Sequence, residues 1–416
     1  MEPVSSLQVA WSTRSSLNQA VGEVVSAAMR HATSPVLALV FSAGDWDRAA
    51  LAQALAAELG SLPWGGCTAT AVFAGRKVMT EGIALGVLSA PQASVGIGLA
   101  GSLSHNPLGA GMAAVARAID HLPPLASACT CACVSADAGA STSAPPRTHR
   151  AVLLFADTFT GSGSAAVRGA VREGGTSVCW AGGGVGGQGR ATGRMSLLAN
   201  GRAFLDRTVA LAIDLPAALG SGMGHGFSPL GPSLSVTHVK GELIEQLEYS
   251  PALATYESLA RSLDAEGDLS TDALFHRYPF GIPQADGGYV LREFVRVTAS
   301  GALEFVSDVP EGSVVRLMRS TTESLIEGAR SAALAARAKL EATPGGALVF
   351  DCDARFLTLG ADFQREIDAI SDALGPDVPL LGCTSYGEVG ALGCSFPQFH
   401  NKTVHVLALP GEEVGR

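Results

Sequence analysis

The chain has 416 residues, of which 47% are apolar and 16% charged, and this length suits two globular domains. Its net charge is −10 and it has no cluster of Lys and Arg, which argues against a nucleic-acid partner. No targeting segment and no apolar run long enough to cross a membrane is visible, so we expect a cytoplasmic protein with free cysteines.

The first predicted unit combines strands with a helix. The apolar run 36–41 predicts a buried strand, and leucines spaced four apart over 51–59 predict a helix that ends at Gly60. A short strand then runs into the Gly-Cys-Thr sequence at 66–68, and residues 83–88 predict a further strand.

The same order of elements recurs twice along the chain. The second copy comprises 152–155, a helix through 167–171, and strands at 178–184 and 208–213; the third comprises 347–350, a helix at 363–374, the Gly-Cys-Thr sequence at 382–384, and a strand at 403–409. Short second and third strands favour mixed or antiparallel sheets. We therefore predict an α/β fold of mixed or antiparallel sheets covered by helices, built from about three strand–helix–strand–strand repeats in two domains.

The segments between the copies differ in character. Residues at about 125–150 are rich in Ala, Ser, Thr, Gly and Pro, which predicts a disordered insertion. The composition changes again near 230–232, which predicts domains at 1–235 and 236–416. Beyond this point we expect a hairpin from strands at 289–297 and 302–306, and a helix over 320–340 with Ser320 and Glu323 as its capping box.

The C-terminal residues resemble the FIST C-terminal domain. The resemblance rests on Asp351-Cys352 with Arg355, on Glu366, on the run 379–390, and on Phe399 to Thr403. The first half resembles the FIST N-terminal domain through 66–68, 155–157 and 182–184. This resemblance implies a sensory protein that binds a small ligand, such as an amino acid, and signals to a partner protein. Other branches of the family imply two alternatives, a ubiquitin-ligase substrate receptor with an F-box and a haem-based gas sensor.

We place the predicted ligand site at the Gly-Cys-Thr turn of the third copy. A Gly-rich strand exit lets backbone N–H groups approach a ligand, Arg355 can hold a carboxylate, and Glu388 can hold an ammonium group. The predicted site residues are Arg355, Gly382, Cys383, Thr384, Ser385, Tyr386, Gly387, Glu388, Asn401, Cys67, Thr68 and Asp157. The alternative is structural: Arg355 and Glu388 form a salt bridge, Cys383 packs in the core, and Asn401 and Asp157 cap turns.

We expect neither an enzyme nor a resident cofactor. The G-x-S-x-G, H-E-x-x-H and P-loop motifs are absent from the sequence, although Cys67 or Cys383 could pair with His400. The run 184–189 matches G-x-G-x-x-G, but the sequence after it does not predict the required helix. Three alternating cysteines at 129–133 lack the spacing of a zinc site, and none of the nine histidines stands out as a haem ligand.

Overall fold

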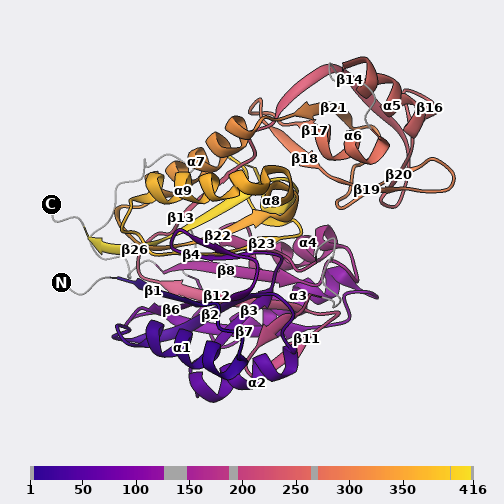
Figure 1. Cartoon of the computed structure of the whole chain (residues 1–416). Helices are drawn as coiled ribbons and strands as arrows, with labels where there is room; N and C mark the ends of the chain where they lie inside the picture. The colour runs from indigo at the N-terminus through magenta and orange to yellow at the C-terminus, as the bar shows by residue number, and fades with distance from the viewer. Residues whose placement is uncertain (1–3, 126–147, 187–194, 264–269, 394, 414–416) are drawn as a thin grey trace, which may run out of the picture.

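The computed structural model describes residues 4–125, 148–186, 195–263, 270–393 and 395–413. The cysteines at 129–133 and nearly all of the insertion expected at about 125–150 lie outside these residues. Figure 1 shows a body of sheets covered by helices, from which a smaller subdomain projects. The predicted α/β class with mixed sheets is confirmed. None of the described helices is both long and apolar enough to span a membrane.

The first unit of the body begins with an edge strand that the sequence analysis did not predict. Its elements are β1 (Ser6–Ser12), α1 (Leu17–Met29), β2 (Pro35–Ala43), α2 (Arg48–Leu59), β3 (Trp64–Thr68), β4 (Val72–Ala74), β5 (Lys77–Met79) and β6 (Gly82–Ser89). Strand β2 is parallel to β3 and antiparallel to β6, and β1 pairs with the free edge of β6. The helices α1 and α2 pack on one apolar face of this sheet.

The second and third units repeat this arrangement. The second consists of β7 (Ser94–Ala100), α3 (Pro107–Ile119), β8 (His149–Ala156), α4 (Gly163–Gly174), β9 (Cys179–Gly184), β10 (Leu197–Ala199), β11 (Arg202–Phe204) and β12 (Thr208–Leu215). The third consists of β13 (Gly220–Gly224), α7 (Thr322–Ala338), β22 (Ala342–Cys352), α8 (Asp353–Leu359), η1 (Gly360–Asp362), α9 (Phe363–Leu374), β23 (Leu380–Ser385), β24 (Glu388–Gly390), β25 (Gln398–His400) and β26 (Val404–Glu413).

The three units exchange short hairpins in a ring. Hairpin β10–β11 of the second unit extends the first sheet beside β3, and β24–β25 of the third unit extends the second sheet beside β9. Hairpin β4–β5 of the first unit closes the ring beside β23. Each sheet therefore has the same order of six strands, and no unit can leave the body without removing strands from another sheet.

One phenylalanine from each unit lies at the centre of the ring. Phe41, Phe155 and Phe350 occupy equivalent positions on β2, β8 and β22, and their ring centroids are 5.7–6.0 Å apart. All three side chains are buried. Edge-to-face contacts of this kind add to the stabilisation from burial, so this triad joins the three sheets into one core.

A glycine lies at the same position on β3, β9 and β23, the strands that run parallel to the three phenylalanine-bearing strands. A β-carbon on Gly66, Gly182 or Gly382 would overlap the backbone carbonyl of the neighbouring first strand. At Gly382 it would also overlap the ring of Phe73, which arrives on the exchanged hairpin. The repeated glycine therefore allows the close approach of the first two strands of each unit, and at Gly382 it also leaves room for the exchanged hairpin.

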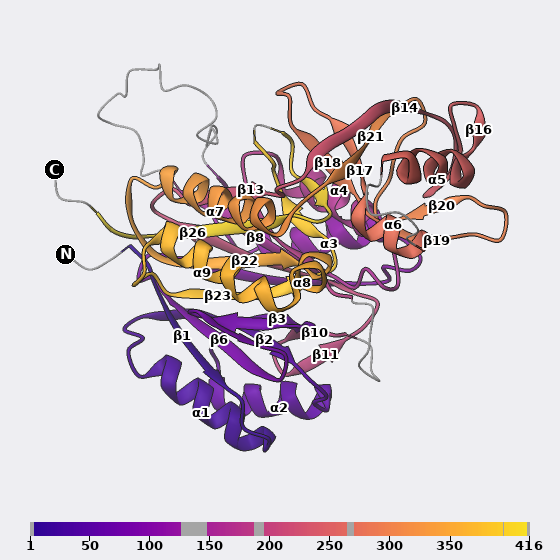
Figure 2. The same ribbon diagram turned by 45° about the horizontal axis from the view of Figure 1, so that its top comes forward.

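The subdomain is inserted between β13 and α7 of the third unit. Its elements are β14 (Ser228–Lys240), β15 (Leu243–Leu247), β16 (Ser250–Pro251), α5 (Ala252–Leu263), α6 (Thr271–Arg277), β17 (Phe280–Pro283), β18 (Tyr289–Arg292), β19 (Phe294–Val297), β20 (Leu303–Phe305) and β21 (Val314–Arg319). It has an apolar core of its own around Tyr256 and Phe280. Figures 1 and 2 show it at the end of the body opposite the start of β1 and the end of β26.

The structure refines three predictions for this region. The predicted boundary at 235 falls inside β14. The predicted hairpin is present as β19 and β20, which pair antiparallel. The predicted helix is α7, but its capping box consists of Thr321 and Ser324 instead of Ser320 and Glu323, because the helix begins at Thr322.

Candidate functional site

A hollow of about 910 Å³ lies where β2 and β3 end, against α8 of the third unit. We call it the strand-end hollow, and its walls include Trp46, Arg48, Thr70, Glu81, Asp353 and Leu357. Ligands of open α/β sheets bind outside the carboxyl ends of the strands. The hollow therefore occupies the part of the first unit where a ligand site is expected.

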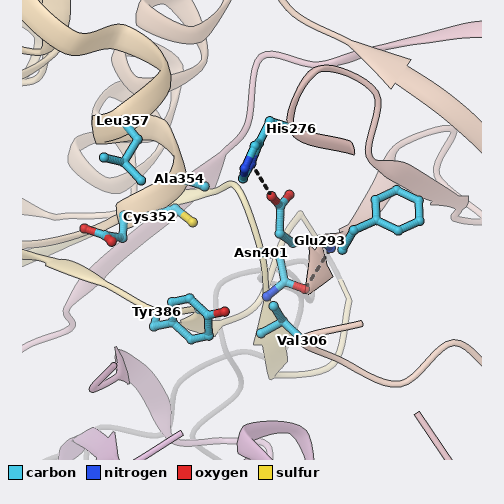
Figure 3. Close-up of a pocket in the computed structure, with 11 residues that line it drawn as sticks. His276, Glu293, Val306, Cys352, Ala354, Leu357, Tyr386 and Asn401 are labelled. Carbon is cyan, nitrogen blue, oxygen red and sulfur yellow. Dashed lines mark hydrogen bonds and ion pairs between the residues drawn. The ribbon is translucent and has the colours of Figure 1, made fainter. Parts of the chain in front are cut away.

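A smaller space of about 30 Å³ lies between α8 and the inserted subdomain. This interdomain cavity is lined on the body side by Cys352, Tyr386 and Asn401, and on the subdomain side by His276 and Glu293. Figure 3 shows the carboxylate of Glu293 pointing toward His276, while the side chain of Asn401 lies against the backbone of Glu293. Asp353 and Leu357 of α8 line both the interdomain cavity and the strand-end hollow, so one short helix separates the two spaces.

Asp353 brings a buried negative group to the hollow. Its side chain is only 4% exposed, and its Oδ1 atom has no hydrogen-bond partner among the described residues. Burial raises the pKa of this carboxyl group, while hydrogen bonds from Thr70 and Thr384 lower it. A buried carboxylate oxygen without a donor is costly to maintain, so it favours a ligand that can donate.

Arg48 brings a positive group to the same hollow. It is the first residue of α2, directly after Asp47, whose side chain caps the helix by accepting from the N–H of Ala50. The Nε atom of Arg48 is buried and has no hydrogen-bond partner among the described residues. A guanidinium group with an unused donor favours a carboxylate ligand.

The predicted pairing of Arg355 and Glu388 around a ligand does not fit the structure. Arg355 is buried, and its guanidinium group contacts Asp351 at 3.2 Å and Glu366 at 2.8 Å. It also donates to the backbone carbonyls of His225, Lys402 and Leu325. With these partners, Arg355 ties α8 to α9 and to the segments that enter and leave the subdomain.

Glu388 is likewise occupied by the protein. Its two carboxyl oxygens accept hydrogen bonds from Ser385, at 2.9 Å, and from the backbone N–H and hydroxyl of Thr403, at 3.1 and 2.7 Å. The residue is fully buried, and burial raises the pKa of its carboxyl group to about 8. Glu388 therefore fixes the turn before β24 from within, and neither it nor Arg355 lines either of the two spaces described here.

The two Gly-Cys-Thr sequences hold the exchanged hairpins. The hydroxyl of Thr68 accepts the N–H of Ser196 at 2.8 Å, and the hydroxyl of Thr384 accepts the N–H of Ala71 at 3.0 Å. Both donors belong to the incoming chain just before its hairpin begins. Cys67 and Cys383 follow the glycines and lie in the same buried apolar cluster as the phenylalanine triad.

Of the predicted site residues, Tyr386, Gly387 and Asn401 line the interdomain cavity, and Thr68 lines the strand-end hollow. Asn401 accepts the backbone N–H of Glu293 at 3.3 Å, and burial raises the pKa of Tyr386 to about 12. Asp157 lies elsewhere, where it accepts the N–H of Asp206 at 2.7 Å in a turn.

His400, the histidine of the possible thiol–imidazole pair, contacts a different group in the structure. His400 is fully buried and its Nε2 atom contacts the carbonyl of Gly390 at 3.1 Å, while burial lowers its pKa to about 3. The thiol of Cys383 lies against that of Cys67, and burial together with this neighbour raises its pKa. Among the described residues, no group of three or more His, Cys, Asp and Glu side chains could hold a metal ion.

Sequence reasoning missed Arg48 and Asp353. Each is the first residue of the helix that follows a predicted strand: Arg48 begins α2 after the strand at 36–41, and Asp353 begins α8 after the strand at 347–350. The position of polar residues after parallel strands was the available signal. The prediction instead placed the site at the Gly-Cys-Thr sequences, which lie on the neighbouring strands.

Comparison with protein families gives a consistent assignment along the chain. The FIST N domain matches residues 36–249, about half of the chain, and the FIST C domain matches residues 252–391. A search of curated proteins found no match. FIST domains are sensory domains of signal transduction. The chain belongs to the FIST family, with a FIST N domain followed by a FIST C domain.

Proposed function

We propose that this protein is a sensor that binds a small zwitterionic ligand, such as an amino acid, in the strand-end hollow. One observation carries the proposal. Asp353 and Arg48 line the same hollow, and each carries a buried polar atom, Oδ1 and Nε respectively, that has no hydrogen-bond partner among the described residues. Opposite charges in one hollow match a molecule that carries both an ammonium and a carboxylate group.

The proposed chemistry is reversible binding. The ligand ammonium would donate to Oδ1 of Asp353, and the ligand carboxylate would accept from Nε of Arg48. Each contact would satisfy one protein atom that is otherwise buried without a hydrogen-bond partner, so binding offsets part of the desolvation cost of each group. The sequence-based expectation of an arginine and a carboxylate around the ligand is kept, with these two residues in place of Arg355 and Glu388.

We propose that the inserted subdomain conveys the binding event. Its contacts with the body include polar ones beside α8: Lys402 lies 2.9 Å from Glu293 and donates to the carbonyl of His276 at 3.1 Å. Leu291 and Met318 of the subdomain also pack in the apolar cluster that contains Leu325 and Ala329 of α7. Units that are packed around separate cores commonly move relative to each other. A ligand that holds Asp353 would favour one position of α8, and α8 also forms a wall of the interdomain cavity. A protein partner that recognises the subdomain position would then receive the signal.

The burial of the cysteine thiols favours binding over catalysis. Burial raises the pKa values of Cys352 and Cys383, which keeps both thiols protonated at neutral pH. A nucleophilic cysteine needs the thiolate form, which positive neighbours usually stabilise. Neither the ubiquitin-ligase alternative nor the haem alternative gains support from a described residue.

A thermal-shift screen against the twenty amino acids tests the proposal. A ligand at a hundredfold excess over its Kd adds about 2.7 kcal/mol to the free energy of unfolding. We expect at least one amino acid to stabilise the wild-type protein, and Asp353→Asn and Arg48→Gln each to reduce that response. The matched control is Arg30→Gln, which changes an exposed arginine at the end of α1. If Asp353→Asn and Arg48→Gln both showed the same ligand-induced stabilisation as the wild type, the proposed site would be contradicted.

A further inference from the structure

The size of the strand-end hollow points to a ligand longer than one amino acid. We propose that its natural occupant is a short peptide with free termini, an inference that rests on the proposed function. The volume of about 910 Å³ lies near the upper end of the roughly 300–1,000 Å³ that pockets for drug-sized molecules span. A free amino acid would leave most of this space to water and could gain little from the walls.

The walls between the charged residues suit peptide side chains. The indole of Trp46 donates to the carbonyl of Ala43 at 2.9 Å, which fixes the orientation of its ring. Leu357 on α8 is 54% exposed although it is a large apolar residue. Both line the hollow, and burying such surfaces against an apolar ligand group is favourable.

Polar groups of the wall suit the peptide backbone. Thr13, Ser15 and Thr80 are exposed residues on the rim of the hollow, and their hydroxyls can both donate and accept. Peptide N–H and C=O groups need such partners when a ligand leaves water. These hydroxyls extend the polar surface beyond the two charged atoms that an amino acid would use.

The charges of the hollow assign the two ends of the peptide. Arg14 also lines the hollow, but its Nε atom is held by Glu23 at 3.3 Å. The carboxylate end is therefore assigned to Arg48, and the ammonium end to Asp353, because the other two carboxylates of the lining, Asp45 and Glu81, belong to exposed residues that water can solvate. This assignment distinguishes a peptide from a polyamine or a dicarboxylate, each of which would leave one of the two charges without a partner.

Pooled ligands test the length of the occupant without knowledge of its sequence. Wild-type protein is melted with the twenty free amino acids, with mixed-sequence dipeptides, and with mixed-sequence tripeptides, at equal total concentrations. The proposal predicts a larger rise in melting temperature with one of the peptide pools than with the free amino acids. An equal or larger rise with free amino acids would overturn it while leaving the proposed function intact. The absence of a rise with all three would overturn both.

Modified termini test the orientation without altering the protein. The tightest-binding member of the peptide pools is compared by calorimetry with its N-acetylated and C-amidated forms. Each modification should weaken the Kd about tenfold or more, because a charged hydrogen bond is lost. In Arg48→Gln the amidation should have little further effect, and in Asp353→Asn the acetylation should have little further effect. If the acetylated or the amidated peptide bound the wild-type protein as tightly as the peptide with free termini, the assignment of that end would be overturned.

Discussion

Replacing Glu388 by Gln should remove a large pH dependence from the stability of the protein. Burial raises the pKa of this carboxyl group from 4.5 to about 8. Between these values the folded protein binds more protons than the unfolded chain, so the free energy of unfolding falls as the pH rises. At 1.36 kcal/mol for each pH unit, the full effect is at most about 5 kcal/mol.

The substitution preserves the shape of the side chain. Its carboxamide oxygen can still accept from Thr403, and its NH₂ group can donate to the hydroxyl of Ser385, which can then donate to the carbonyl of Asp351 at 3.3 Å. We expect the variant to gain several kcal/mol relative to the wild type between pH 5 and pH 9.

Urea unfolding followed by circular dichroism at several pH values measures this difference. Glu58→Gln, which changes an exposed carboxylate on α2, serves as the control and should follow the wild type. Parallel pH profiles for Glu388→Gln and the wild type would refute the reasoning. They would mean that Glu388 is ionised in the folded protein, as its predicted role in ligand binding required.

Three further predictions concern the fold and the docking of the subdomain. Phe350→Ala opens a cavity at the centre of the phenylalanine triad, so it should lower the free energy of unfolding by about 3–5 kcal/mol. Urea unfolding measures this loss, and a loss under about 1 kcal/mol would contradict the role of the triad. Gly382→Ala should prevent stable folding, because the added β-carbon would overlap the neighbouring strand. Gly22→Ala, which lies inside α1 with open space around it, should instead stabilise the protein by about 1 kcal/mol. Thermal melts in which Gly382→Ala is the more stable of the two variants would contradict the packing argument. Lys402→Met removes the lysine that lies against the buried carboxylate of Glu293, so hydrogen exchange should become faster in the subdomain and stay unchanged in the body. Exchange rates in the subdomain equal to those of the wild type would show that this ion pair does not hold the subdomain.

The main elements of the body were predictable because their signals are local. Apolar runs and helical periodicity mark the first two strands and the helix of each unit, and their recurrence reveals the repeats. The exchanged hairpins were not predictable, because each strand such as β4 or β24 has only three residues and pairs with a strand from a distant part of the chain.

The candidate site was harder to predict than the fold. The sequence shows that Arg355 and Glu388 are charged, but it does not show that both are buried among protein partners. The Gly-Cys-Thr sequences look like a ligand turn because close backbone approach and hydroxyl groups serve hairpin exchange equally well. Asp353 and Arg48 lie 305 positions apart (353 − 48), and their common hollow arises from the packing of the first unit on the third.

Hydrogen exchange of the whole chain with and without a saturating ligand pool tests the central claim most directly. The pool contains free amino acids, dipeptides and tripeptides, so the measurement does not depend on the identity of the ligand. We predict slower exchange in the segments 43–48 and 353–357, which line the strand-end hollow, and a changed rate at 276–293 in the subdomain. Slower exchange confined to 382–388, or to segments remote from the hollow, would contradict the account.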